Sequence, residues 1–154
     1  MVAFVFLCST RPVEGQVRGV ARAPVVSAEV VRSELIDEGA ALGVRIAVTV
    51  PTGHHGYVDR GDDGFYIPFS FGFPALLEAG GATTELERPT GVRDEAVRAH
   101  VLRERAEFEY ELGPVAALRS LEELRATLRY QVCNDRTGIC YPPRTVVVVV
   151  PLPS

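Results

Sequence analysis

The chain has 154 residues, of which 47% are hydrophobic and 23% charged, with a formal net charge of −4 and an isoelectric point near 5.4. This length and composition fit one soluble globular domain with a core of its own. The acidic balance argues against a nucleic-acid-binding surface, because phosphate binding needs clustered cationic charge and the arginines here are spread along the chain.

The N-terminal segment carries only part of an export signal. Residues 2–7 are apolar but too short for the core of such a signal, and no basic residue precedes them, so we interpret 1–8 as a truncated export signal. Leu7 stands where a lipid-attachment site has a small residue, which argues against lipidation of Cys8. The next stretch, rich in Arg, Gly and Val without a stable period, predicts that 1–23 form a flexible leader before a domain over 24–154.

Alternating apolar residues and β-prone runs predict a series of strands. Between 106 and 112, apolar residues alternate with glutamates, which predicts a strand with one acidic face toward solvent. Pro68 interrupts an aromatic run, which indicates that part of this run forms an edge strand or a bulge. The predicted strands cover residues 25–32, 44–50, 65–73, 83–88, 106–112, 124–133 and 145–150.

The segment before the cysteines has two competing patterns. Leucines at 118, 121, 124 and 128 recur at helical spacing, whereas residues 126–132 alternate as a strand does. We therefore predict a helical turn over 115–122, followed by a strand from about 124 to 133. Short strands separated by turns, with little helix, indicate an all-β protein built as an antiparallel β-sandwich.

Two cysteines, Cys133 and Cys140, flank a predicted tight turn whose chemistry is supplied by Asn134, Asp135 and Gly138. Opposed positions on antiparallel strands lie about 4.5 to 5.5 Å apart, which falls inside the separation that a disulfide accepts. A disulfide closing so short a loop stabilises the fold by only about 2.5 kcal/mol in the chain-entropy account. The residues themselves leave two interpretations open, a structural staple and a redox-exchange pair.

Metal and nucleotide chemistry are less well supported. His54 and His55 invite a zinc interpretation, but adjacent strand residues point to opposite faces and the cysteines are spaced more widely than usual zinc ligands, so no metal or cofactor is predicted. Asp59, Asp62 and Asp63 lack the spacing of a calcium loop and are interpreted as solvated loop acids. A Cys-x-x-Cys motif and a Gly-rich phosphate loop are both missing from the sequence.

The flanks of the cysteines are more distinctive than their spacing: Tyr130-Gln131 precedes Cys133, and Tyr141-Pro142-Pro143 follows Cys140. With these flanks the chain resembles the N-terminal domain of the bacterial thiol:disulfide interchange protein DsbD, the disulfide bond corrector family. The resemblance extends over about 25–152 and includes strands near 53–57 and 102–105. It implies an immunoglobulin-like antiparallel β-sandwich whose cysteine pair exchanges disulfides in the periplasm, or otherwise outside the cytoplasm, without a cofactor.

The resemblance also implies a role for each cysteine. Cys140 forms mixed disulfides with partners, and Cys133 is the enclosed thiol that resolves them. The two prolines agree with this assignment, because they lack N–H groups and leave the chain after Cys140 incompletely paired. Protonation of a histidine near the sulfurs would stabilise a thiolate and lower the pKa of the cysteine. The flanking site residues that the resemblance implies are Tyr141, Pro142, His55 and Tyr57.

In the family a cap loop shields the disulfide until a partner docks. The matching stretch, about 93–99, is shorter here and lacks the usual Phe-Tyr pair, so either the cap is reduced or Phe65-Tyr66 takes its place. A less shielded disulfide would be more open to general thiols.

These observations together predict an exported electron-relay domain. The expected donor is a thioredoxin-like protein or a membrane thiol reductase on a separate chain, and the expected acceptors are oxidised extracytoplasmic proteins. The alternative is a non-catalytic immunoglobulin-like binding module that the same disulfide staples. A staple should resist mild reductants, whereas a relay should exchange with a thioredoxin-like protein.

Overall fold

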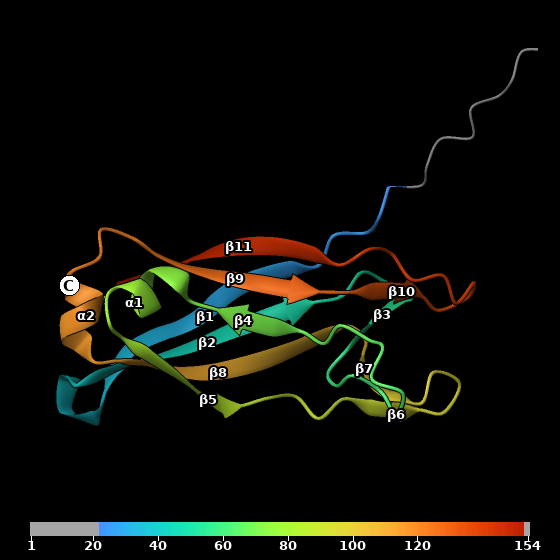
Figure 1. Cartoon of the computed structure of the whole chain (residues 1–154), viewed down its shortest axis with the longest axis horizontal. Helices are drawn as coiled ribbons and strands as arrows, with labels where there is room; N and C mark the ends of the chain where they lie inside the picture. The colour runs from blue at the N-terminus through green and yellow to red at the C-terminus, as the bar shows by residue number, and fades with distance from the viewer. Residues whose placement is uncertain (1–21, 153–154) are drawn as a thin grey trace, which may run out of the picture.

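The computed structural model describes residues 22–152, so the predicted export signal, Cys8 and most of the predicted leader lie outside the described residues. Within the described range, no helix has the length and apolarity to cross a bilayer. Figure 1 shows a molecule dominated by antiparallel strands. The elements, in chain order, are β1 (Ser27–Ile36), the 3₁₀ turn η1 (Asp37–Gly39), β2 (Ala41–Thr49), β3 (His54–Tyr57), β4 (Ser70–Gly72), α1 (Pro74–Glu78), β5 (Ala82–Glu87), β6 (Val92–Asp94), β7 (Ala99–Leu102), β8 (Arg105–Gly113), α2 (Val115–Arg119), β9 (Leu124–Tyr130), β10 (Val132–Asn134) and β11 (Arg144–Val150).

The strands form three sheets. One sheet has the order β1-β2-β8-β5, and a second, with the order β11-β9-β4, packs against it across the main hydrophobic core. The third sheet, β10-β3-β7-β6, lies at one end of the molecule, and the short helices α1 and α2 lie at the other (Figure 1). The predicted all-β, immunoglobulin-like antiparallel sandwich is confirmed.

Strand β8 shows why the alternating pattern was informative. Phe108 and Leu112 are fully buried and Tyr110 nearly so, while the intervening glutamates face outward as predicted. Glu109 accepts a hydrogen bond of 2.8 Å from Arg45 on β2 and also pairs with Arg32 on β1. Glu109 on this acidic face is therefore paired with arginines on β2, the neighbouring strand, and on β1 beyond it.

The bounds of the predicted strands differ from those in the structure, and two of these differences have a clear cause. Of residues 65–73, only Ser70–Gly72 form a strand, because Pro68 has no N–H to donate and makes only an isolated bridge with Tyr57. The first predicted strand, 25–32, begins later and runs on to Ile36, since its ladder with β2 continues down to the pair Ile36–Ala41.

The predicted strand over 124–133 is divided at Gln131. Its first part, β9, pairs with β11, whereas β10 pairs with β3 in the end sheet, so a single continuous strand was wrong. The helical turn before it is present but shorter than 115–122, because α2 ends at Arg119. Helix α1 and the short strands β6 and β7 were not predicted from local pattern.

A buried hydrogen bond ties the first strand to the core. The backbone N–H of Val26 donates to the hydroxyl of Tyr130 at 3.1 Å, and both residues are 1% exposed. Tyr130→Phe should lower the free energy of unfolding by about 1 to 3 kcal/mol, because it leaves a buried donor unpaired. Urea titration followed by circular dichroism would measure the change, and an unchanged midpoint would contradict it.

Candidate functional site

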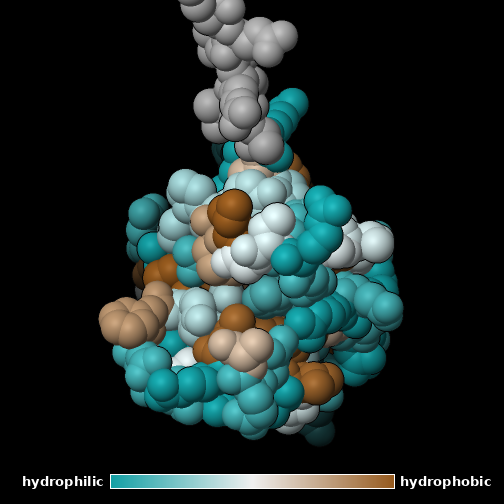
Figure 2. Space-filling view, turned by 90° about the vertical axis from the view of Figure 1, so that its right-hand side faces the viewer, coloured by the Kyte–Doolittle hydropathy of each residue, from teal (hydrophilic) through white to brown (hydrophobic). Residues whose placement is uncertain are grey.

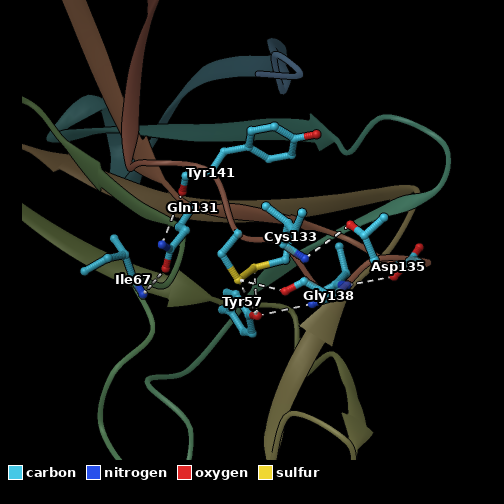
Figure 3. The surroundings of a disulfide bond; sticks show 11 residues. Tyr57, Ile67, Gln131, Cys133, Asp135, Gly138 and Tyr141 are labelled. Atoms are coloured by element: carbon cyan, nitrogen blue, oxygen red, sulfur yellow. Dashed lines mark hydrogen bonds and ion pairs between the residues drawn. A yellow bond between two sulfur atoms is a disulfide. The ribbon is translucent and has the colours of Figure 1, made fainter. Parts of the chain in front are cut away.

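Cys133 and Cys140 form a disulfide at the end of the sandwich that carries β10 (Figure 3). Cys133 lies in β10 opposite His55 of β3, and it makes an isolated antiparallel bridge with Cys140. Their Cα atoms are 3.9 Å apart, closer than the spacing expected for opposed strand positions. The prediction of two paired strands was therefore only partly right, because Cys140 belongs to the closing arm of a turn and not to a strand.

The turn between the cysteines is held by its own hydrogen bonds. Asn134 donates its backbone N–H to the carbonyl of Ile139, and its own carbonyl accepts from the N–H of Gly138, both at 2.9 Å. The Asn134 side chain caps the turn by accepting from two backbone N–H groups, those of residues 136 and 137. The turn that brings the sulfurs together is thus also held by hydrogen bonds that do not involve the sulfur atoms.

The two sulfur-bearing residues differ strongly in exposure. Cys133 is 1% exposed and packs in a small cluster with Tyr57, Ala99 and Val101, apart from the main core. Cys140 is exposed. An attacking thiolate from outside can therefore reach one sulfur of the pair far more easily than the other.

The hydroxyl of Tyr57 contacts both sulfurs of the disulfide. It lies 3.0 Å from Sγ of Cys133 and 3.7 Å from Sγ of Cys140 (Figure 3). Burial, followed by the charge that Tyr66 would carry if ionised, raises the pKa of Tyr57, so the hydroxyl stays protonated at neutral pH and can donate to a sulfur. Strand β3 thus presents a hydrogen-bond donor to both members of the pair.

His55 lies beside Tyr57 in the same buried region. Its Nε2 is 3.2 Å from the Tyr57 hydroxyl, and its Nδ1 is 2.7 Å from Oδ1 of Asp135 in the cysteine turn. His54 turns the other way, toward the ring of Tyr141, at a centroid distance of 5.9 Å. Within residues 22–152, no three His, Cys, Asp or Glu side chains gather as metal ligands would.

Asp135 had been interpreted from the sequence only as a turn residue, yet it contacts two distant side chains. It accepts from His55, and Nε of Arg103 donates to it at 3.2 Å. Partial burial raises the pKa of Asp135, but the hydrogen bond from His55 and the charge of Arg103 outweigh burial and lower the pKa below its ordinary value. Asp135 is therefore an anion at neutral pH, anchored between two potential cations.

The residues after Cys140 pack against Gln131, at the break between β9 and β10. Tyr141 donates its N–H to the carbonyl of Val132 at 2.9 Å, and its carbonyl accepts from Nε2 of Gln131 at 3.3 Å. Gln131 also accepts from the N–H of Ile67 at 3.4 Å (Figure 3). Pro142 is exposed, so the chain leaves the site directly after Tyr141.

The stretch expected to match the family's cap, about 93–99, spans the end of β6, a turn and the start of β7. Of the substitute pair, Tyr66 stacks on Tyr57 with ring centroids 3.9 Å apart and planes at 11°, whereas Phe65 is 80% exposed. Val97, from the turn between β6 and β7, packs on the same small cluster. Tyr66 therefore supplies the aromatic cover of Tyr57.

Comparison with known proteins identifies the family of the chain. The sequence profile of the family described as "Thiol:disulfide interchange protein DsbD, N-terminal" matches residues 23–152. No curated protein matches the chain. The crystal structure of the Neisseria meningitidis DsbD N-terminal domain in the reduced form aligns with 75% of this chain and 88% of its own, at 17% sequence identity and a TM-score of 0.44. The profile match spans most of the chain and confirms the resemblance predicted from the cysteine flanks, so the chain belongs to the DsbD N-terminal domain family.

Proposed function

We propose that this chain is an extracytoplasmic thiol–disulfide exchange domain that accepts electrons from a thioredoxin-like donor and passes them to oxidised proteins. The observation that carries the proposal is the unequal exposure of a bonded pair, with Cys140 open to solvent and Cys133 buried. Membership of the family supports exchange chemistry and a location outside the cytoplasm, where disulfides persist.

The exposure of Cys140 and the burial of Cys133 determine the order of the exchange steps. A donor thiolate attacks Sγ of Cys140, a mixed disulfide forms, and the electron pair of the broken bond leaves with Cys133. The donor's second thiolate then attacks the donor sulfur of the mixed disulfide, which releases Cys140 and leaves the donor oxidised. Two electrons and two protons have then moved from the donor to the pair. Reduction of an acceptor runs the same steps in reverse, with Cys140 attacking and Cys133 resolving.

The exposed residues next to Cys140 and next to Tyr66 support docking of a partner. Ile139, next to Cys140, is 62% exposed, and Phe65, next to Tyr66, is 80% exposed. Figure 2 shows that this end of the molecule carries apolar groups scattered among hydrophilic ones. Small apolar patches with a polar surround suit short-lived protein contacts better than a permanent interface.

A structural staple is the competing interpretation. Its weakness is that the turn already holds itself through the backbone bonds of Asn134, so the disulfide would add little order there. A staple should also be hard to reduce, with a potential below about −300 mV.

The test is reduction of the oxidised protein by a catalytic amount of a thioredoxin-like protein from the same organism. A Cys8→Ser background leaves Cys133 and Cys140 as the only thiols. We expect two thiols per chain to appear, and a glutathione equilibrium to give a potential above about −300 mV. The triple variant with Cys133→Ser and Cys140→Ser added is the matched control. A pair that stays oxidised would establish the staple.

A further inference from the structure

Three side-chain contacts in series connect the surface with the buried sulfur of Cys133. The Asp135 carboxylate, with 30% of its side chain exposed, contacts Nδ1 of His55 at 2.7 Å. Nε2 of His55 contacts the Tyr57 hydroxyl at 3.2 Å, and this hydroxyl contacts Sγ of Cys133 at 3.0 Å. His55 is 3% exposed and Tyr57 is fully buried. The contacts therefore connect a solvent-facing anion to a sulfur that solvent does not reach.

The number of hydrogens available to these three contacts fixes the charge of His55. A disulfide sulfur has no hydrogen, so Tyr57 must donate in its contact with Cys133. An ionised carboxylate has none either, so Nδ1 of His55 must donate to Asp135. The single Tyr57 hydrogen is already used on the sulfur, which leaves Nε2 of His55 as the donor to the Tyr57 oxygen. All three contacts are hydrogen bonds at once only when both ring nitrogens carry a hydrogen.

A neutral His55 would reverse the direction of the hydrogen bond between His55 and Tyr57. With its hydrogen on Nδ1 toward Asp135, Nε2 becomes an acceptor and takes the Tyr57 hydrogen, so the sulfur loses its donor. In the dithiol the situation differs, because the Cys133 thiol can donate to Tyr57, Tyr57 to His55, and His55 to Asp135. The oxidised pair is thus matched to a charged His55 and the reduced pair to a neutral one.

We propose that Asp135, His55 and Tyr57 form a proton relay that protonates Cys133 when the disulfide opens and recovers the proton when it re-forms. The inference rests on the proposed function in taking Cys133 as the leaving thiol. When a thiolate attacks Cys140, the electron pair of the sulfur–sulfur bond stays on Cys133. The Tyr57 hydrogen moves to that sulfur, and the Nε2 hydrogen of His55 replaces it. Tyr57 is catalytic, while His55 and Asp135 act through it.

The burial of Cys133 makes a thiolate there unfavourable, and the relay offsets this by supplying a proton. A thiolate formed at a site that is 1% exposed lacks water to stabilise it and is a poor leaving group unless a donor meets it. Tyr57 is already in hydrogen-bond contact before the bond breaks, so no water has to enter.

Charged groups from several elements face the relay. Arg103, between β7 and β8, donates to Asp135 and also to Asp94 of β6 at 2.8 Å, which holds both carboxylates in place. The charge of a protonated His55 contributes, after the hydrogen bond from Arg103, to lowering the pKa of Asp94. The titratable and charged groups around the relay are Asp135, Asp94, Arg103, Tyr66 and the two cysteines.

The test is the pH profile of reduction by dithiothreitol, with each rate constant divided by the fraction of reductant present as thiolate. In the wild type with Cys8→Ser, this normalised constant should fall as pH rises, because only a ring with hydrogens on both nitrogens can pass one to Tyr57. In His55→Gln it should be flat, and at about pH 5.5 it should be about tenfold lower than in the wild type. Tyr57→Phe should also be flat. Asp135→Asn, at a partly exposed position, should reduce the low-pH constant without disturbing packing.

The other two histidines provide matched controls. His54→Gln changes the neighbouring residue on β3, and His100→Gln changes the other histidine that pairs with an aspartate, Asp59, at 2.6 Å. Both should keep the wild-type profile. A falling profile that survives in His55→Gln, or a flat profile in the wild type, would overturn the relay. Because the reductant is a small molecule, this result is independent of whether a thioredoxin-like protein reduces the pair.

Discussion

Cys133→Ser should accumulate a covalent complex with a thioredoxin-like donor through Cys140, whereas Cys140→Ser should accumulate little. The exposed Cys140 can reach the donor's sulfur, while Cys133 is 1% exposed and lies under Tyr57. With Cys133 removed, no internal thiol is left to resolve the mixed disulfide, so the complex persists. The formation rates of the two variants should differ by about tenfold or more.

The measurement needs a donor with a single cysteine that carries a thionitrobenzoate group, because complex formation then releases a coloured anion. Both variants should contain Cys8→Ser, so that each has one thiol within the site. Reaction of both variants in urea is the control, since unfolding should make the two thiols equally reactive. The role assignment is wrong if folded Cys140→Ser reacts as fast as Cys133→Ser.

Gly56→Ala should destabilise the site end of the fold by about 1 to 3 kcal/mol. Gly56 lies in β3 between Val132 of β10 and Leu102 of β7, and a Cβ there would overlap the ring of Phe69. Phe69 cannot easily move away, because it is fully buried and packs against Tyr130 with ring centroids 6.1 Å apart. The close approach of strand and ring thus requires a residue without a side chain.

A double-mutant cycle tests this explanation. Phe69→Leu removes the ring atoms that the new Cβ would meet, so Gly56→Ala should cost less in that background, by at least about 0.5 kcal/mol. Gly113→Ala is the matched control, because a Cβ there meets nothing closer than 3.5 Å. Free energies of unfolding from urea titration give the comparison. Equal costs in both backgrounds would rule out the Phe69 overlap as the cause.

The fold was predictable from the sequence where a single strand is long enough to show an alternation of buried and exposed residues. Strand β8 alternates cleanly because one face is buried and the other is charged, and β9 alternates in the same way. The break at Gln131 was not predictable, because it depends on β9 and β10 choosing partners in different sheets. Strands as short as β6, with three residues, leave too few positions for a period to show.

The site was predictable only in part. The cysteine pair and its flanks stand together in the sequence, so the family and the disulfide could be expected. The contact of His55 with Asp135 joins residues 80 positions apart, and no local pattern reports such a contact. The stacking of Tyr66 on Tyr57 is likewise a contact that only the fold creates, so the sequence alone could not choose between the two cap alternatives.

The turn that closes on itself between Cys133 and Cys140 has a consequence for how partners distinguish the two redox states. Its backbone hydrogen bonds, together with the one from Tyr141 to Val132, do not involve the sulfurs, so we expect the oxidised and reduced forms to share one outline. A partner then has no global change of shape to recognise. It must distinguish the two states by a few atoms, namely the sulfurs and the direction of the Tyr57 hydroxyl. The difference between the oxidised and reduced forms therefore lies within the surface that a docked partner covers.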